Sequence, residues 1–143
     1  MPIEFHFQKN IIFKGRKKLK SFIPTIFELN NTVAGNISFV FCSDDYLLEI
    51  NKEFLNHDYF TDIITFDLTP KKQKEVDAEI YISVDRVKEN AKSNSVPTEL
   101  ELNRVIFHGI LHLCGYGDKT SSQKSVMTLK EDHFLSLFSR GTL

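Results

Sequence analysis

The sequence predicts a single small α/β (α+β) domain, with one mixed sheet of roughly four strands and about five helices. Its 143 residues suit one domain. With 41% hydrophobic and 26% charged residues, the composition is typical of a soluble globular protein and excludes a collagen, a disordered tail or a disulfide-dense mini-protein. Segments with strand periodicity are mixed with segments of helical periodicity, which favours a sheet covered by helices. Neither a repeat nor a linker is evident, so residues 1–143 are expected to form one domain.

Four segments have the patterns of β-strands. Residues 3–8 alternate apolar and polar side chains, the pattern of a half-buried strand. Residues 36–43, 61–66 and 78–84 are rich in β-branched and aromatic side chains, which favour strands. The polar stretch 69–77 between the last two is predicted to be a loop.

Five segments space their apolar residues as helices do: 15–30, 44–55, 85–94, 97–114 and 122–139. Pro24 lies inside the first of these and is expected to kink the helix or to displace its start. Ser43 is predicted to cap the second helix. Pro97 and Glu99 mark the first turn of the fourth, where proline is tolerated and acidic side chains oppose the helix dipole.

The overall charge does not indicate a nucleic-acid partner. Eighteen basic and nineteen acidic side chains give a net charge of −1, so an RNA partner would have to meet a local basic patch. The run Lys14–Lys20 holds five basic side chains in seven residues and is the candidate for tracking an RNA backbone. The alternative is a solvated helix start.

The protein is expected to be cytoplasmic and to have no membrane partner. Cys42 and Cys114 lie in apolar stretches and are predicted to be free thiols in a reducing compartment. The N-terminus has no secretory pattern, and no apolar run approaches the roughly 18 to 20 residues that cross a bilayer.

The stretch from residue 108 to residue 118 carries a candidate metal site. His108 and His112 lie one helical turn apart and point about 40° from each other. Gly115 can adopt the positive φ that turns the chain back and brings Asp118 over the two imidazoles, whereas Cys114 falls on the opposite side. Three N/O ligands with a fourth position open form the pattern of a catalytic zinc site, so one Zn²⁺ ion is predicted.

The same stretch argues against peptidase chemistry. With Gly115 and Asp118 it reproduces the metzincin frame H-x-x-x-H-x-x-G-x-x-H, with an aspartate in place of the last histidine. However, Gly109 stands where zinc peptidases carry the glutamate that serves as general base. A metal-dependent hydrolase of another substrate, such as a peptidase, is therefore the third and least favoured hypothesis.

Three blocks in order resemble a known family. The first block, His108–Tyr116, is similar to the family pattern H-G-x-L-H-L-x-G-Y-D-H. The second, residues 50–66, is similar to L-N-x-x-F-R-x-K-D-x-P-T-D-V-L-S-F. The third, residues 78–83, is similar to G-D-I-x-I-S. Together they resemble the YbeY-type endoribonucleases of bacterial rRNA maturation, over roughly residues 36–135.

The resemblance implies a zinc-dependent endoribonuclease that is specific for single-stranded RNA and acts in ribosomal RNA maturation and ribosome quality control. It implies that His108, His112 and Asp118 are the zinc ligands. The implied partners are ribosomal RNA and the ribosome or its small subunit, with no DNA expected.

One departure from the family pattern is Leu55, which stands where the second block has an arginine. Lys119 and His57 are the candidates to contact phosphate instead, with exposed loop residues as the alternative, and Asp62 is a candidate for orienting an imidazole. Tyr59-Phe60 could stack bases. The missing arginine keeps a second hypothesis open, an RNA- or ribosome-associated metal-binding factor with little or no cleavage activity.

Overall fold

The computed structural model describes residues 3–11 and 14–141, and in these residues it has four strands and five helices. The strands are β1 (Ile3–Phe7), β2 (Val33–Cys42), β3 (Ile63–Asp67) and β4 (Glu75–Ser83). The helices are α1 (Arg16–Leu29), α2 (Asp44–Leu55), α3 (Val84–Ser93), α4 (Thr98–Leu113) and α5 (Ser121–Arg140). The predicted α+β class with one mixed sheet is confirmed.

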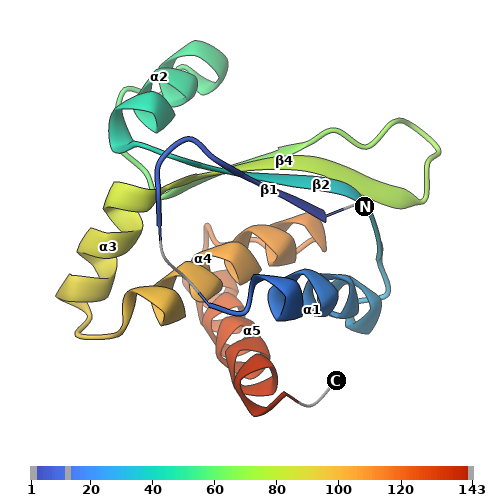
Figure 1. Cartoon of the computed structure of the whole chain (residues 1–143). Helices are drawn as coiled ribbons and strands as arrows, with labels where there is room; N and C mark the ends of the chain where they lie inside the picture. Colours follow the sequence, from blue (N-terminus) through green and yellow to red (C-terminus); the bar gives the residue numbers. More distant parts are fainter. Residues whose placement is uncertain (1–2, 12–13, 142–143) are drawn as a thin grey trace.

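The sheet has the order β1-β2-β4-β3. β1, β2 and β4 run parallel, whereas β3 runs antiparallel to β4 and forms one edge. Figure 1 shows α1, α3, α4 and α5 on one side of the sheet and α2 beyond its other side. None of the helices in the described part of the chain has the length and apolar character that crossing a bilayer requires.

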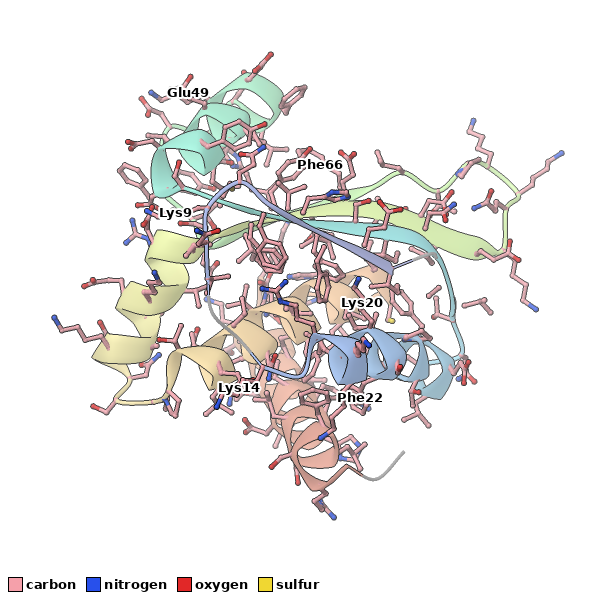
Figure 2. The ribbon with its side chains drawn as sticks, in the orientation of Figure 1. Lys9, Lys14, Lys20, Phe22, Glu49 and Phe66 are labelled. Atoms are coloured by element: carbon pink, nitrogen blue, oxygen red, sulfur yellow. The ribbon has the colours of Figure 1, made fainter. Side chains whose placement is uncertain are left out.

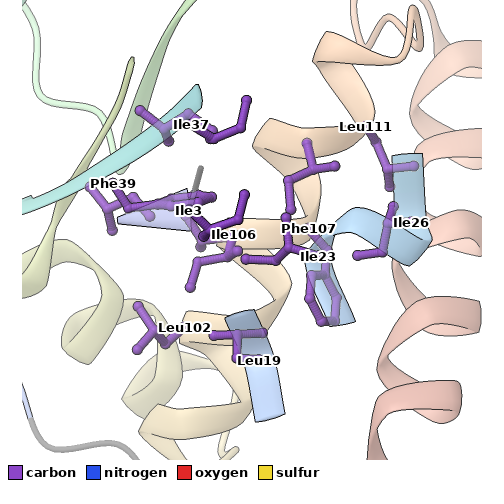
Figure 3. Close-up of a cluster of buried hydrophobic side chains, with 14 of the residues drawn as sticks. Ile3, Leu19, Ile23, Ile26, Ile37, Phe39, Leu102, Ile106, Phe107 and Leu111 are labelled. Carbon is purple, nitrogen blue, oxygen red and sulfur yellow. The ribbon is translucent and has the colours of Figure 1, made fainter. Parts of the chain in front are cut away.

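The main core lies between the sheet and α1, α4 and α5. Phe22 of α1 is 1% exposed and packs on aromatic rings of α4 and α5, and Figure 2 shows it on this side of the sheet. Alternate residues of β2, such as Ile37 and Phe39, face Ile106 and Leu102 of α4 (Figure 3). Burying this apolar surface is the main favourable term in folding.

α2 covers the opposite face with a smaller cluster. Leu47 and Ile50 of α2 pack against Cys42 and Ile64 of the sheet. Ser43 caps α2 as predicted, since its side chain accepts a hydrogen bond from the N–H of Tyr46.

The structure differs from the predicted elements at several ends. β2 and β4 begin before the predicted 36 and 78, because Val33 and Ala34 pair with Glu75 and Val76. The extension includes residues 75–77 of the predicted loop, of which Val76 is buried in the main core. α1 begins at Arg16 and continues past Pro24, so the proline does not displace its start.

Candidate metal centre

Helix α4 places the histidine pair at the surface of the core. One side of α4 is buried in the core through Leu102, Ile106 and Ile110. Another side carries His108 and His112, which are partly exposed. The imidazole centroids lie 4.5 Å apart with the rings nearly perpendicular, and the two Nε2 atoms are 3.0 Å apart. The helical spacing therefore produces the convergence that the sequence predicted.

A Schellman motif ends α4 and turns the chain back toward the histidines. The N–H of Tyr116 donates to the carbonyl of Leu111, and that of Gly115 donates to the carbonyl of His112, both at 3.0 Å. Gly115 has φ +103°, a conformation that disfavours any side chain. Two residues after Asp118, Thr120 begins α5 with a capping box. Asp118 is thus held between two defined helix ends.

The three candidate ligand atoms form a nearly equilateral triangle. The Oδ2 atom of Asp118 lies 3.2 Å from Nε2 of His112 and 3.3 Å from Nε2 of His108. Tetrahedral zinc with ligands at about 2.0–2.1 Å places its ligand atoms about 3.3 Å apart. His108, His112 and Asp118 therefore form a group that could hold a metal ion, and their donor types and spacing fit zinc.

Both histidines use their second nitrogen to contact the protein. Nδ1 of His112 lies 2.8 Å from the carbonyl of Tyr116, which can only accept, so this nitrogen carries the proton and Nε2 keeps its lone pair. Nδ1 of His108 lies 2.6 Å from Oε2 of Glu131, a buried carboxylate of α5. Such outer partners fix the orientation and tautomer of metal-binding histidines.

Arg104 connects Glu131 to a second carboxylate. Its guanidinium donates to Oε1 of Glu131 at 2.9 Å and to Oδ1 of Asp132 at 2.6 Å. Burial opposes the charged form of His108, but the hydrogen bond and charge of Glu131 outweigh it and raise the pKa of His108. The carboxylate of Glu131 therefore contacts the guanidinium of Arg104 with one oxygen and the imidazole of His108 with the other.

The triad lies in a cleft of about 670 Å³ that polar and apolar side chains line together. The three candidates Lys119, His57 and Asp62 line this cleft, and so does Leu55, the residue at the position of the family arginine. Asp62 lies near His108, and burial raises the pKa of its carboxyl despite the opposing charge of that histidine. Asp62 was predicted as a candidate to orient an imidazole, and Nδ1 of His108 contacts Oε2 of Glu131 at 2.6 Å.

One buried side chain holds the loop that carries His57. The side chain of Asn51 in α2, which is 1% exposed, donates from Nδ2 to the carbonyl of Tyr59, and the backbone carbonyl of Asn51 accepts from the N–H of His57. The rings of His57 and Tyr59 stack at 5.0 Å, and the tyrosine hydroxyl lies 2.8 Å from Nδ1 of the histidine. Tyr59 lines the cleft, whereas Phe60 lies under the guanidinium of Arg86.

Gly109, the residue at the position of the peptidase glutamate, packs closely against β3. A Cβ at this position would lie 2.8 Å from Cδ1 of Ile63 and 3.3 Å from Oγ1 of Thr65. A side chain at this position would therefore require the Ile63 side chain to move.

The basic run Lys14–Lys20 lies away from the cleft. The backbone N–H of Lys14 contacts Glu99 at the start of α4, and His112 lies about 20 Å further along this helix at about 1.5 Å per residue. The ammonium group of Lys20 lies 5.2 Å from the ring centroid of Phe5. The run is not continuous with the metal-binding group.

The sequence reasoning missed Glu131 and Asn51. Glu131 lies 23 residues from His108 and belongs to another helix. Asn51 resembles any polar residue of an amphipathic helix. The exclusion of Cys114 was correct: it ends α4 outside the triad, and burial raises the pKa of its thiol to about 11.

The fold and this site define a class of protein: a small α+β domain with a cleft that holds two helical histidines and an aspartate able to bind a metal ion, the arrangement of metal-dependent hydrolases. Comparison with known proteins specifies the family. The family model described as Endoribonuclease YbeY matches residues 4–139. The chain belongs to the YbeY endoribonuclease family.

Individual relatives are similar to this chain over most of their length. The Endoribonuclease YbeY of Cytophaga hutchinsonii is 45% identical over 124 residues, covering 87% of this chain and 86% of the relative. The Endoribonuclease YbeY of Flavobacterium psychrophilum is 41% identical over 136 residues, covering 95% of this chain and 96% of the relative. The solution structure of TM1509 from Thermotoga maritima has a TM-score of 0.63 and 29% identity, covering 95% of this chain and 88% of that one.

Proposed function

We propose that this chain is a zinc-dependent, single-strand-specific endoribonuclease that acts on ribosomal RNA in maturation and quality control of the ribosome. The observation that carries the proposal is the convergence of two Nε2 atoms and one carboxylate oxygen within 3.0–3.3 Å, with both Nδ1 atoms occupied by other partners. The relatives named Endoribonuclease YbeY support the substrate class.

His108, His112 and Asp118 would hold the zinc ion. When bound, zinc supplies a Lewis acid that polarises a phosphoryl oxygen and lowers the pKa of water. Glu131 and the carbonyl of Tyr116 keep the imidazoles aimed at the cleft.

The remaining cleft residues suit a phosphodiester. With Nδ1 of His57 accepting a hydrogen bond from the hydroxyl of Tyr59, the Nε2–H of His57 is a donor for a phosphate oxygen, and Lys119 adds a cation to the lining of the cleft. The phenol ring of Tyr59, which is 56% exposed, offers a face for a base. Asp62, whose pKa burial raises, is the candidate to carry a proton.

A metal-binding factor with little or no cleavage is the second candidate function. The observation that favours it is Leu55, which places an apolar side chain in the cleft where the family carries a cation. The two functions predict the same metal content and differ only in the rate of RNA cleavage.

Metal content and cleavage of a labelled single-stranded RNA test the proposal together. We expect one zinc per wild-type chain, and loss of both zinc and cleavage in His112→Ala and Asp118→Ala, because two ligands cannot hold the ion well. His133→Ala is the matched control, since His133 is exposed on α5 away from the triad. A wild-type protein that binds no zinc contradicts the proposal.

The same assay separates the two functions. His57→Ala is expected to keep its zinc and to lose about tenfold or more in cleavage rate, as a lost charge-assisted hydrogen bond would. Zinc-loaded wild type that does not cleave single-stranded RNA would support the second candidate and overturn the first.

A further inference from the structure

A small pocket lies between α1, α4 and α5, on the side of the sheet opposite α2. Its volume is about 340 Å³. Side chains of three helices line it, among them Lys18 of α1, Glu99 and Asn103 of α4, and Leu135 and Phe138 of α5. None of its lining residues lines the metal cleft, so the pocket is a separate place on the molecule.

Asn103 brings an unpaired amide to this pocket. The residue is 7% exposed, yet its side-chain amide has no hydrogen bond to any residue that the structure describes. The amide atoms are not sealed from solvent, because the chain's fully buried side-chain atoms without a partner, among the described residues, comprise Nε of Arg86 alone. Buried amides are normally hydrogen-bonded, since burial removes their water without replacing it. An amide that opens into a pocket without a partner is therefore available to a ligand.

Glu99 and Phe138 define the rest of the pocket. Oε1 of Glu99 accepts from the backbone N–H of Lys14 at 3.1 Å, which holds the carboxylate and leaves its second oxygen for another donor. The ammonium group of Lys18 lies 4.6 Å from the ring centroid of Phe138 and donates to the carbonyl of that residue at 2.7 Å. The pocket thus combines a fixed acceptor, an amide that both donates and accepts, and an aromatic ring.

These groups match the edge and face of a nucleobase that carries an exocyclic amino group. A carboxylate accepts from N4 of cytosine, and an asparagine amide pairs with the amino group and ring nitrogen of adenine. Apolar and aromatic walls contact the faces of unstacked bases. A phosphate does not suit the interior of the pocket, because Glu99 is anionic.

The basic run Lys14–Lys20 supplies the cations that a phosphate needs, and it lies beside the pocket. Its basic side chains are exposed, and Figure 2 shows Lys14 and Lys20 at the start of α1. Its lysines form no ion pair with any carboxylate in the described part of the chain. The first turn of α1 holds no acidic residue, although the helix dipole disfavours cations there. The run is therefore not explained by the stability of α1, and it is free to attract an external polyanion.

We propose that this face is a second RNA-binding site, at which one unstacked cytosine or adenine enters the pocket while the flanking phosphates contact the basic run. Glu99 lies about 20 Å from His112 along α4, at about 1.5 Å per residue. A single strand that reaches both places would be held at this face and cut in the metal cleft. The choice of RNA as the polyanion rests on the proposed function, whereas the pocket and its unpaired amide do not.

Anisotropy of a fluorescent oligocytidine bound to the full chain tests the pocket, with His112→Ala as the background so that the probe is not cut. We expect oligocytidine to bind about tenfold more tightly than oligouridine, because uracil has no exocyclic amino group to donate to Glu99. Asn103→Leu should weaken oligocytidine binding about tenfold and abolish this preference. The same variant should not lower stability in urea, because the amide that it replaces makes no hydrogen bond within the described chain.

The salt dependence of binding tests the basic run. Lys14→Gln/Lys17→Gln should weaken the binding of both RNAs and reduce the slope of log K against log salt by about 1.4, since each phosphate contact on a single strand contributes about 0.7. Lys71→Gln/Lys74→Gln is the matched control, because it removes two exposed cations from the loop between β3 and β4. The control should bind both RNAs as the background chain does.

Cleavage kinetics add a second readout. In the zinc-loaded chain with His112 intact, Asn103→Leu and Lys14→Gln/Lys17→Gln should raise KM for a long single-stranded RNA and leave kcat unchanged, because neither touches the cleft. Cleavage without the expected binding pattern overturns this proposal alone, whereas the binding pattern without cleavage overturns the ribonuclease function alone.

Three further results overturn the proposal. The first is equal weakening by the control Lys71→Gln/Lys74→Gln, which would reduce the effect to net charge. The second is competition by CMP as strong as that by oligocytidine, which would make a free nucleotide the ligand. The third is equal competition by a polyglutamate peptide, which would make an acidic protein segment the partner.

Discussion

At the scale of single residues, the candidate metal centre depends on a carboxylate outside the histidine motif. Glu131 accepts from Nδ1 of His108 at 2.6 Å and is itself paired with Arg104. This arrangement leaves the Nε2 lone pair of His108 directed at the triad. Outer partners of this kind contribute to metal affinity without touching the ion.

Replacing Glu131 by glutamine should lower zinc affinity about 10- to 100-fold, because the imidazole loses its anionic partner. Competition with a chromophoric chelator measures this change. Asp132→Asn is the matched control, since Asp132 binds the same Arg104 but does not contact His108. Equal zinc affinities in the two variants would assign Glu131 a purely structural role.

At the scale of elements, the turn between α4 and α5 assembles the site. It reverses the chain through Gly115, supplies the carbonyl that fixes His112, and places Asp118 before the capping box of α5. One short segment thus provides a candidate ligand, an orienting group and two helix ends. Its geometry depends on the positive φ at Gly115.

Gly115→Ala should destabilise the fold by about 1–2 kcal/mol, because alanine is strained at φ +103°, and should also lower zinc affinity. Urea unfolding and chelator competition measure the two effects. Gly141→Ala tests the same strain at φ +68°, at the end of α5 and away from the site, and should leave zinc affinity unchanged. If zinc affinity is the same in both variants, the turn does not position the ligands.

At the scale of the whole molecule, an ion-pair junction ties β1, α2 and α3 together. Asp85 of α3 accepts hydrogen bonds from the ammonium group of Lys9, just after β1, and from the backbone N–H of Asp44 in α2. These two bonds lower the pKa of the Asp85 carboxyl. The ionised form of Asp85 is therefore favoured by the folded state.

Because the folded-state pKa of Asp85 is lowered, its stabilisation is present above the unfolded-state pKa of about 3.9 and is lost as the pH falls through the folded-state value. Asp85→Asn should reduce the free energy of unfolding at pH 7 by less than about 1 kcal/mol, since the side chain is 37% exposed. The difference from wild type should shrink in acid. Urea unfolding at pH 7 and pH 3 checks this, with Glu89→Gln of α3 as control; a difference that grows in acid would contradict it.

The net charge of −1 also has a meaning at this scale. Lys18 and Lys20 of the basic run lie over the rings of Phe138 and Phe5, three glutamates line a groove between α2 and the strands β3 and β4, and the cleft of the candidate metal centre lies between α4 and the loop after α2. Opposite charges are thus segregated to different surfaces. The near-zero net charge therefore does not describe any one of these surfaces.

The sequence by itself determined the number and type of the elements and the convergence of His108, His112 and Asp118 on one face. These features follow from local rules: the periods of strands and helices are set by backbone geometry, and a glycine after a helix permits the reversing turn. Only the tertiary structure decided that Glu131 orients His108, that Asn51 holds the His57 loop, and that Gly109 lies against β3. Those contacts join elements distant in the chain, and they depend on how the helices and the sheet pack, which periodicity does not specify.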